Sequence, residues 1–154
     1  MCQKVPLTQP SITPVSDREY ELDTTYLCSF YRDKKKKWHI ELTIKPGFIY
    51  DGASVPRIFW SLSGLRPDGL HRAASLVHDY LYVKKGKLSG FETRLCTGDH
   101  WNRVSRVELS RKNTDRIFLD MMFEAGMSKF KARMACYSVR AAGWVLWNRK
   151  PKLA

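Results

Sequence analysis

Two stretches near the start of the chain are rich in β-branched and aromatic residues, a composition typical of β-strands. They are "YELDTTYLCSFY", residues 20–31, and "KWHIELTIK", residues 37–45. Because the charged segment "RDKKKK" lies between them, the pattern predicts a β-hairpin with a charged tip. A turn signal follows at Pro46-Gly47, and the apolar run "FIY" then predicts another short strand.

The next pattern has helical spacing. Apolar residues recur at intervals of three and four between a start near Asp68 or Leu70 and an end near Gly86. They are Ala73, Leu76, Val77, Tyr80 and Leu81. Residues 86–105 show no clear period, and we expect a crossing loop there, with at most a short strand or helical turn.

Two further helices are expected to close the chain. Ser110 suits the N-cap of the first, which Gly126 ends, and Ser128 suits the N-cap of the second, which runs to about Trp147. Strands therefore come first and helices after. This order predicts an α+β fold, in which an N-terminal antiparallel β-hairpin or small sheet precedes a helical C-terminal half.

The length of the chain, 154 residues, suits a single domain. We place this domain at residues 17–147. Residues 1–16, with their three prolines, are expected to form an extended arm, and residues 148–154 a basic tail.

Charge narrows the range of partners. The formal net charge is +12, a field that favours polyanions such as nucleic acid, anionic lipid headgroups or anionic cell-wall polymers. The run Lys34–Lys37 is either a solvated turn or one of the contacts to such a polyanion.

The four cysteines are far apart and form no C-x-x-C pair, which argues against a zinc knuckle. The N-terminus lacks the apolar core of a signal peptide, so we expect a cytosolic protein with reduced thiols. Cys28, Cys96 and Cys136 are interpreted as buried or idle thiols. No uninterrupted apolar stretch is long enough for a membrane-spanning helix.

Polar residues on the first predicted helix gather around one face. His71, His78 and Tyr82 share this face, Ser75 lies with them, and Asp79 is rotated from His78 by about 100°. Such a face suits the wall of a cleft.

A second acid is expected to point inward. Asp115 lies on the apolar face of the following helix, so its carboxylate needs a partner there: an arginine, a helix N-terminus or a metal. Asp120 instead shares a polar face with Arg116 and Glu124, which predicts a solvated ion-pair stripe.

The motifs "GFIYDGASVPRIFW", "AASLVHDYLY" and "SRKNTDRIFLDMMFEAG", followed by a closing helix, resemble a small family of bacteriophage and prophage proteins known as a domain of unknown function. The resemblance covers roughly residues 46–143. It implies a phage or prophage origin, with the protein in the host cytoplasm or in the virion, and it supplies no reaction.

The His78-Asp79 pair is also similar, more weakly, to the metal centre of HD-type phosphohydrolases. That likeness implies a divalent metal, either Zn, Mn, Fe or Mg. The candidate ligands and catalytic residues are Asp51, His78, Asp79 and Asp115. The candidate substrate-binding residues are Ser54, Arg57, His71 and Tyr82.

The same residues also have a purely structural interpretation, in which Asp79 pairs with Arg57 or Arg72 and Asp51 forms a turn with Ser54. A serine nucleophile is a weaker alternative, because Pro56 stands where the second glycine of a nucleophile elbow would lie. Two function classes therefore remain. One is a phage metal-dependent hydrolase of an anionic substrate, either a phosphoester or a cell-wall peptide. The other is a non-enzymatic virion, tail or assembly component that binds phage structural proteins or nucleic acid.

Overall fold

A computed structural model describes residues 2–17, 19–51 and 71–148, apart from the side chains of Asp51 and Leu146. Ser54 and Arg57 lie outside these residues, and so does most of the expected basic tail. The described strands form three antiparallel sheets, ordered β1-β2-β5, β3-β4-β7-β8 and β6-β9. Their bounds are β1 Ile12–Pro14, β2 Glu19–Leu22, β3 Tyr26–Tyr31, β4 His39–Ile44, β5 Ile49–Asp51, β6 Lys87–Ser89, β7 Thr93–Thr97, β8 His100–Arg103 and β9 Arg106–Glu108.

The predicted hairpin is present as β3 and β4, with Tyr31 opposite His39 at the turn. The four lysines of its tip are exposed. Several apolar side chains of both strands are buried and contribute to the core, because the helices cover this sheet. They are Tyr26, Cys28, Phe30, Ile40, Leu42 and Ile44. The first predicted strand segment breaks at residues 23–25, so its beginning becomes β2 in a different sheet.

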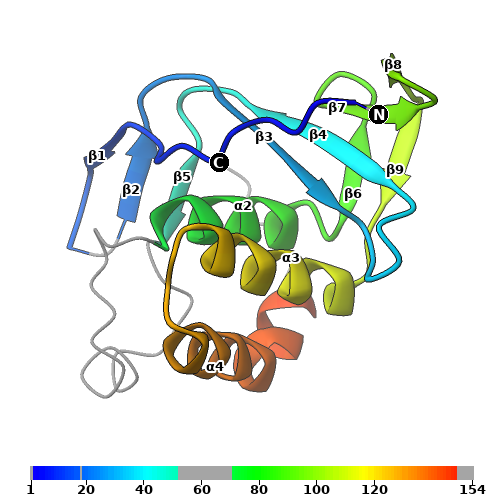
Figure 1. Ribbon diagram of the computed structural model, residues 1–154. Coiled ribbons are helices and arrows are strands. Elements are labelled where there is room, and N and C mark those ends of the chain that lie inside the picture. Colours follow the sequence, from blue (N-terminus) through cyan, green and yellow to red (C-terminus); the bar gives the residue numbers. More distant parts are fainter. Residues whose placement is uncertain (1, 18, 52–70, 149–154) are drawn as a thin grey trace.

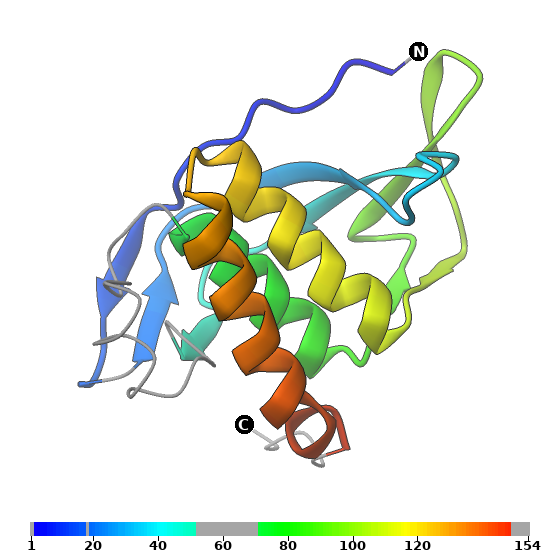
Figure 2. The same cartoon turned by 60° about the horizontal axis from the view of Figure 1, so that its bottom comes forward.

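Three helices are described: α2 Arg72–Val83, α3 Arg111–Glu124 and α4 Lys129–Asn148. Figure 1 shows α2 and α3 beneath the β3-β4 sheet, with α4 farther from it. Figure 2 shows α4 in front of the other two helices, both of which it contacts. None of the described helices is long and apolar enough to cross a membrane.

The helix ends follow the sequence signals. The side chain of Ser110 accepts a hydrogen bond from the backbone N–H of Asn113, and Ser128 accepts one from Lys131. Gly126 adopts a φ of +87° just beyond α3, a conformation that favours glycine. These predicted boundaries are confirmed, and so is the α+β class.

Residues 86–105 differ from the expected loop. They contain β6, β7 and β8, and β9 follows directly. Strand β7 pairs with β4, which lies far from it in the chain, and β6 pairs with β9. Helix α2 is therefore inserted between two sets of strands. The sequence did not reveal these strands because each is short. Strands β7 and β8 form a tight hairpin with Thr97 opposite His100, whereas the β4–β7 and β6–β9 pairings join more distant segments.

The N-terminal arm is attached to the domain along its length. The backbone N–H of Val5 donates to the Ser29 hydroxyl at 2.9 Å, and the Tyr26 hydroxyl donates to the Thr8 carbonyl at 2.7 Å. Lys4 forms an ion pair with Glu124 on α3 at 2.6 Å. Residues 12–14 of the arm form β1, which pairs with β2. The arm is thus continuous with the β-structure.

The expectation of four reduced thiols is wrong for two of them. Cys2 and Cys96 form a disulfide that joins the arm to β7, with their Cα atoms 5.9 Å apart. The sequence could not reveal this pair, because only the path of the arm along the domain brings the residues together. Cys28 and Cys136 are free and buried, as predicted, and burial raises the pKa of both thiols.

Candidate functional site around His78

Helix α2 places polar side chains inside the protein. Every residue from Ala73 to Tyr82 is buried, because strands and the other two helices surround this helix. Ser75, His78 and Asp79 are therefore enclosed together with the apolar residues. Buried polar groups of this kind need partners, since desolvation without hydrogen bonds is costly.

The strongest partner of His78 is Asp115 on α3. The Nε2 atom of His78 lies 3.0 Å from Oδ1 of Asp115, and both side chains are almost fully buried. Because an ionised carboxylate only accepts hydrogen bonds, Nε2 carries a proton and donates it. The prediction that Asp115 points inward and needs a partner is confirmed. That partner is a histidine, which had not been among the expected ones.

Tyr82 joins the same oxygen. Its hydroxyl donates to Asp115 Oδ1 at 2.6 Å, one helical turn beyond His78. The His78 ring also packs against the rings of Tyr82 and Phe118, with centroid distances of 4.2 and 4.8 Å. These contacts fix the plane of the imidazole, so the direction of its second nitrogen is fixed as well.

That second nitrogen, Nδ1, lies 3.7 Å from Oδ1 of Asp79. The distance is too long for a direct hydrogen bond of ordinary strength. Asp79 is close enough to Tyr50, on β5, to act on it electrostatically: burial raises the pKa of Tyr50, and the Asp79 charge raises it further. Asp79 therefore faces β5, the strand that ends at Asp51.

The electrostatics of His78 favour the cation. Burial on its own lowers the pKa of His78, but the hydrogen bond to Asp115 and the negative charges of Asp115 and Asp79 outweigh it, so the pKa is raised above the ordinary 6.5. A metal bound at Nδ1 would have to displace the proton held there. Metal binding at this site would therefore weaken as the pH falls.

Two donor atoms of this site fit a divalent metal. Zinc bonds of about 2.0–2.2 Å in tetrahedral geometry place two ligand atoms roughly 3.4 Å apart, close to the 3.7 Å between His78 Nδ1 and Asp79 Oδ1. The contact from Nε2 to Asp115 matches the carboxylate that commonly orients a metal-binding histidine. Among the described side chains, however, no three His, Cys, Asp or Glu residues converge on one point.

A protein family described as "Protein of unknown function (DUF1353)" matches residues 26–139. The chain belongs to this family. Comparison with curated proteins and with solved structures found no significant match. The DUF1353 region contains β3 to β9, α2, α3 and the first half of α4. It includes His78 and the residues around it, Asp79, Tyr82 and Asp115, which we call the His78 network. The resemblance deduced from the motifs is therefore confirmed at the level of a domain of unknown function.

Within the DUF1353 region, the structure brings three predicted residues together directly: His78, Asp115 and Tyr82. Asp79 adjoins them, and His71 is buried at the start of α2. The backbone of Asp51 pairs with Glu19, whereas its side chain lies outside the described part. Ser54 and Arg57 also lie outside it, so their predicted roles stay predictions.

Two residues near the network were missed. Arg111 lies one turn before Asp115 on α3, close enough for its charge to lower the pKa of the Tyr82 hydroxyl against the larger, opposing effect of burial. Gly143, on α4, packs so closely that a Cβ there would lie 2.5 Å from that hydroxyl. The spacing of four between Arg111 and Asp115 was a usable signal for the first, whereas a glycine within a helix indicates close packing only in general terms.

Proposed function

We propose that the chain is a phage- or prophage-encoded metal-dependent hydrolase that acts on an anionic substrate. The observation that carries this proposal is the orientation of His78. Asp115 accepts the hydrogen bond of Nε2 and is itself held by the Tyr82 hydroxyl, and Nδ1 is left beside Asp79. This arrangement needs only one or two further oxygen ligands to hold a divalent cation.

In this proposal the residues divide into two groups. His78 Nδ1, Asp79 and Asp51 hold the cation, while Asp115 and Tyr82 orient His78. A bound cation would supply an activated water by lowering its pKa. Arg57, Ser54 and His71 would bind the anionic group of the substrate.

The net charge of +12 supports an anionic substrate, because it attracts phosphate- or carboxylate-bearing polymers. Nucleotides, nucleic acids and cell-wall peptides all fit this chemistry. The host cytoplasm and the virion are both suitable places for such an enzyme.

The deciding experiment measures metal content. Untagged protein is dialysed against zinc or manganese and analysed by mass spectrometry, beside variants Asp79→Asn and Asp115→Asn. We expect stoichiometric metal in the wild type and none in Asp79→Asn. Asp115→Asn should bind about 10–100-fold more weakly, as is usual when an orienting carboxylate is lost.

Asp120→Asn is the matched control. Asp120 lies on the same helix as Asp115, but it is exposed and pairs with Arg116 at 3.4 Å. This variant should keep the metal content of the wild type. Wild-type protein that stays metal-free after dialysis would contradict the proposal, and so would an Asp79→Asn variant that retains metal.

A second candidate function is a non-enzymatic virion or assembly component. It is favoured by the observation that Asp115, His78 and Tyr82 already satisfy one another without a ligand. In that case Asp79→Asn lowers only stability, and the protein is found in purified virions at a fixed copy number.

A further inference from the structure

Helix α4 has one face without a partner in the described part of the protein, directly opposite the face that it buries. Three aromatic side chains lie along this exposed face at intervals of seven residues: Phe130, Tyr137 and Trp144. Their exposed fractions are 69%, 63% and 60%. The buried face is formed by other residues of α4, namely Ala132, Ala135, Cys136, Val139 and Gly143. We call the three aromatic residues the α4 stripe.

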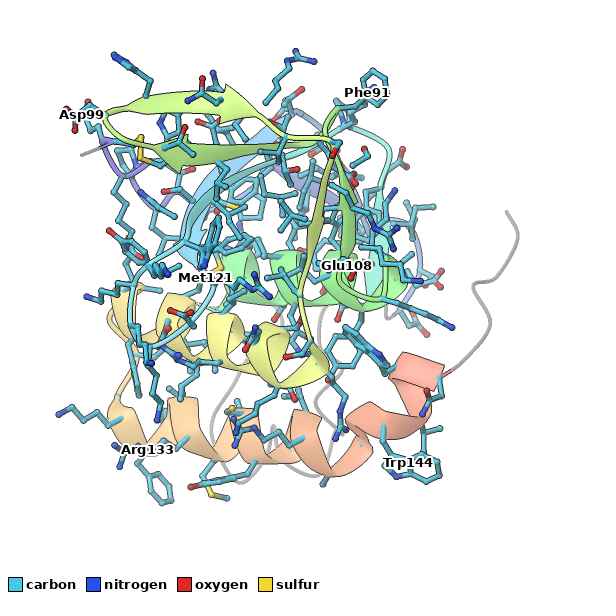
Figure 3. The ribbon with its side chains drawn as sticks, turned by 90° about the vertical axis from the view of Figure 1, so that its right-hand side faces the viewer. Phe91, Asp99, Glu108, Met121, Arg133 and Trp144 are labelled. Atoms are coloured by element: carbon cyan, nitrogen blue, oxygen red, sulfur yellow. A yellow bond between two sulfur atoms is a disulfide. The ribbon has the colours of Figure 1, made fainter. Side chains whose placement is uncertain are left out.

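The stripe carries positive charge along one side. Arg133 and Arg140 are exposed and lie between the aromatic residues, at the helical positions that border them. In Figure 3, Arg133 and Trp144 both extend from α4 on the side away from α3. Single exposed aromatics are common on protein surfaces, but a continuous line of three with flanking arginines indicates an interaction surface.

No acid opposes this charge on the helix. The sequence of α4 has four basic residues and no Asp or Glu, and residues 149–154 add three more basic residues without an acid. The exposed acids of the neighbouring helix are Asp120 and Glu124. They pair with Arg116 and Lys4. The charge of the α4 face is therefore complementary to an anionic partner.

We propose that the α4 stripe binds the surface of an anionic lipid bilayer. Two turns of helix separate successive aromatics by about 10 Å, so the three rings form a straight, convex ridge. Such a ridge suits a flat, deformable surface, where Phe, Tyr and Trp favour the headgroup region and arginine reaches the phosphates.

Other occupants fit less well. Single-stranded nucleic acid is usually held in a basic groove, with bases stacked at closer spacing than the stripe offers. A second copy of the chain would bring Arg133 and Arg140 of each helix together, and like charges at such short range repel one another. The bilayer accommodates both the aromatic residues and the basic ones.

Vesicle co-sedimentation tests the proposal with the full chain. The probes are vesicles of phosphatidylcholine alone and vesicles with an equal part of phosphatidylglycerol. We expect binding to the anionic vesicles only, weakened by salt. Replacing all three aromatics by serine should lower the partition coefficient about tenfold or more, and Arg133→Gln with Arg140→Gln should lower it as well.

The chain offers matched controls. Phe91, which is 87% exposed, lies in Figure 3 at the opposite end of the molecule from α4. Phe91→Ser should therefore bind anionic vesicles like the wild type. The double variant Lys34→Gln with Lys35→Gln should bind them more tightly than the double variant Arg133→Gln with Arg140→Gln. Circular dichroism checks that each variant is folded. If the variant with all three aromatics replaced is not folded, the single variant Trp144→Ser is used in its place.

Three results would overturn the proposal. The first is wild-type protein that does not sediment with anionic vesicles. The second is an equal loss of binding in Phe91→Ser and in the stripe variant. The third is protein that does not bind vesicles but binds a single-stranded oligonucleotide through the aromatic residues of the α4 stripe.

Discussion

The close contact between Gly143 and Tyr82 predicts that one substitution will reverse the effect of another. A Cβ at residue 143 would lie 2.5 Å from the Tyr82 hydroxyl. That hydroxyl cannot easily move, because it donates to the buried Asp115 at 2.6 Å and its ring packs edge-on against Trp147. Gly143→Ala should therefore lower the free energy of unfolding by about 1–3 kcal/mol, the usual cost of overpacking.

The effect of Gly143→Ala on the free energy of unfolding should change sign when the Tyr82 hydroxyl is absent. Tyr82→Phe alone should cost about 1–3 kcal/mol, because it removes a donor from a buried carboxylate. In this background the nearest atoms to the new methyl group are Arg111 Nη1 at 3.4 Å and the ring carbon at 3.5 Å, distances close to ordinary contact. Gly143→Ala should then stabilise by about 0.5–1 kcal/mol, the gain from replacing glycine within a helix.

Urea unfolding followed by circular dichroism measures all four proteins of this cycle. The coupling energy should be about 2 kcal/mol or more. Ala141→Gly is the control, since Ala141 is exposed on the same helix and its replacement should cost the same in both backgrounds. If Gly143→Ala has an equal effect with Tyr82 and with Phe at that position, the packing argument is refuted.

Three further predictions concern stability. The pKa of His78 is raised, so its stabilising effect is complete below pH 6.5 and is lost as the pH rises through the folded-state value. Urea titrations across pH should show this loss in the wild type and a smaller loss in Asp115→Asn, because the charge of Asp79 remains. Reduction of the Cys2–Cys96 disulfide should destabilise by up to about 4–5 kcal/mol, and a thermal melt of Cys2→Ser should no longer respond to reductant. Gly86→Ala should cost more than about 2 kcal/mol, because its φ is +70° and a Cβ would overlap the Leu109 carbonyl oxygen; an unchanged urea midpoint would contradict this.

Local sequence signals predicted the fold where neighbours in the chain are also neighbours in space. The β3-β4 hairpin, the caps at Ser110 and Ser128, and the inward position of Asp115 all follow from spacing within a few residues. The ion pair between Arg116 and Asp120 belongs to the same class, since one helical turn separates the two residues.

What the sequence left hidden depends on contacts between distant segments. The pairing of β7 with β4 joins segments far apart in the chain, and so does the disulfide between Cys96 and Cys2. The partner of Tyr82 was hidden for the same reason. Its position on the His78 face suggested substrate binding, which stays a prediction, and the approach of α3 brings its hydroxyl to Asp115. Spacing along one helix identifies a shared face without specifying which group lies opposite.

The insertion of α2 between β4 and β7 has a consequence for the order in which the chain folds. The β3-β4 hairpin is local and can form early, whereas β7 joins β4 only after the intervening residues have been synthesised. Until then the edge of β4 is open, and three of the six residues in its sequence "HIELTI" are apolar. An unpaired apolar edge readily pairs with another chain. If residues 45–92 are synthesised slowly, β4 stays unpaired for longer, and more of the protein should aggregate during expression. A lower temperature slows folding and translation to different extents, so it should change the yield of monomer.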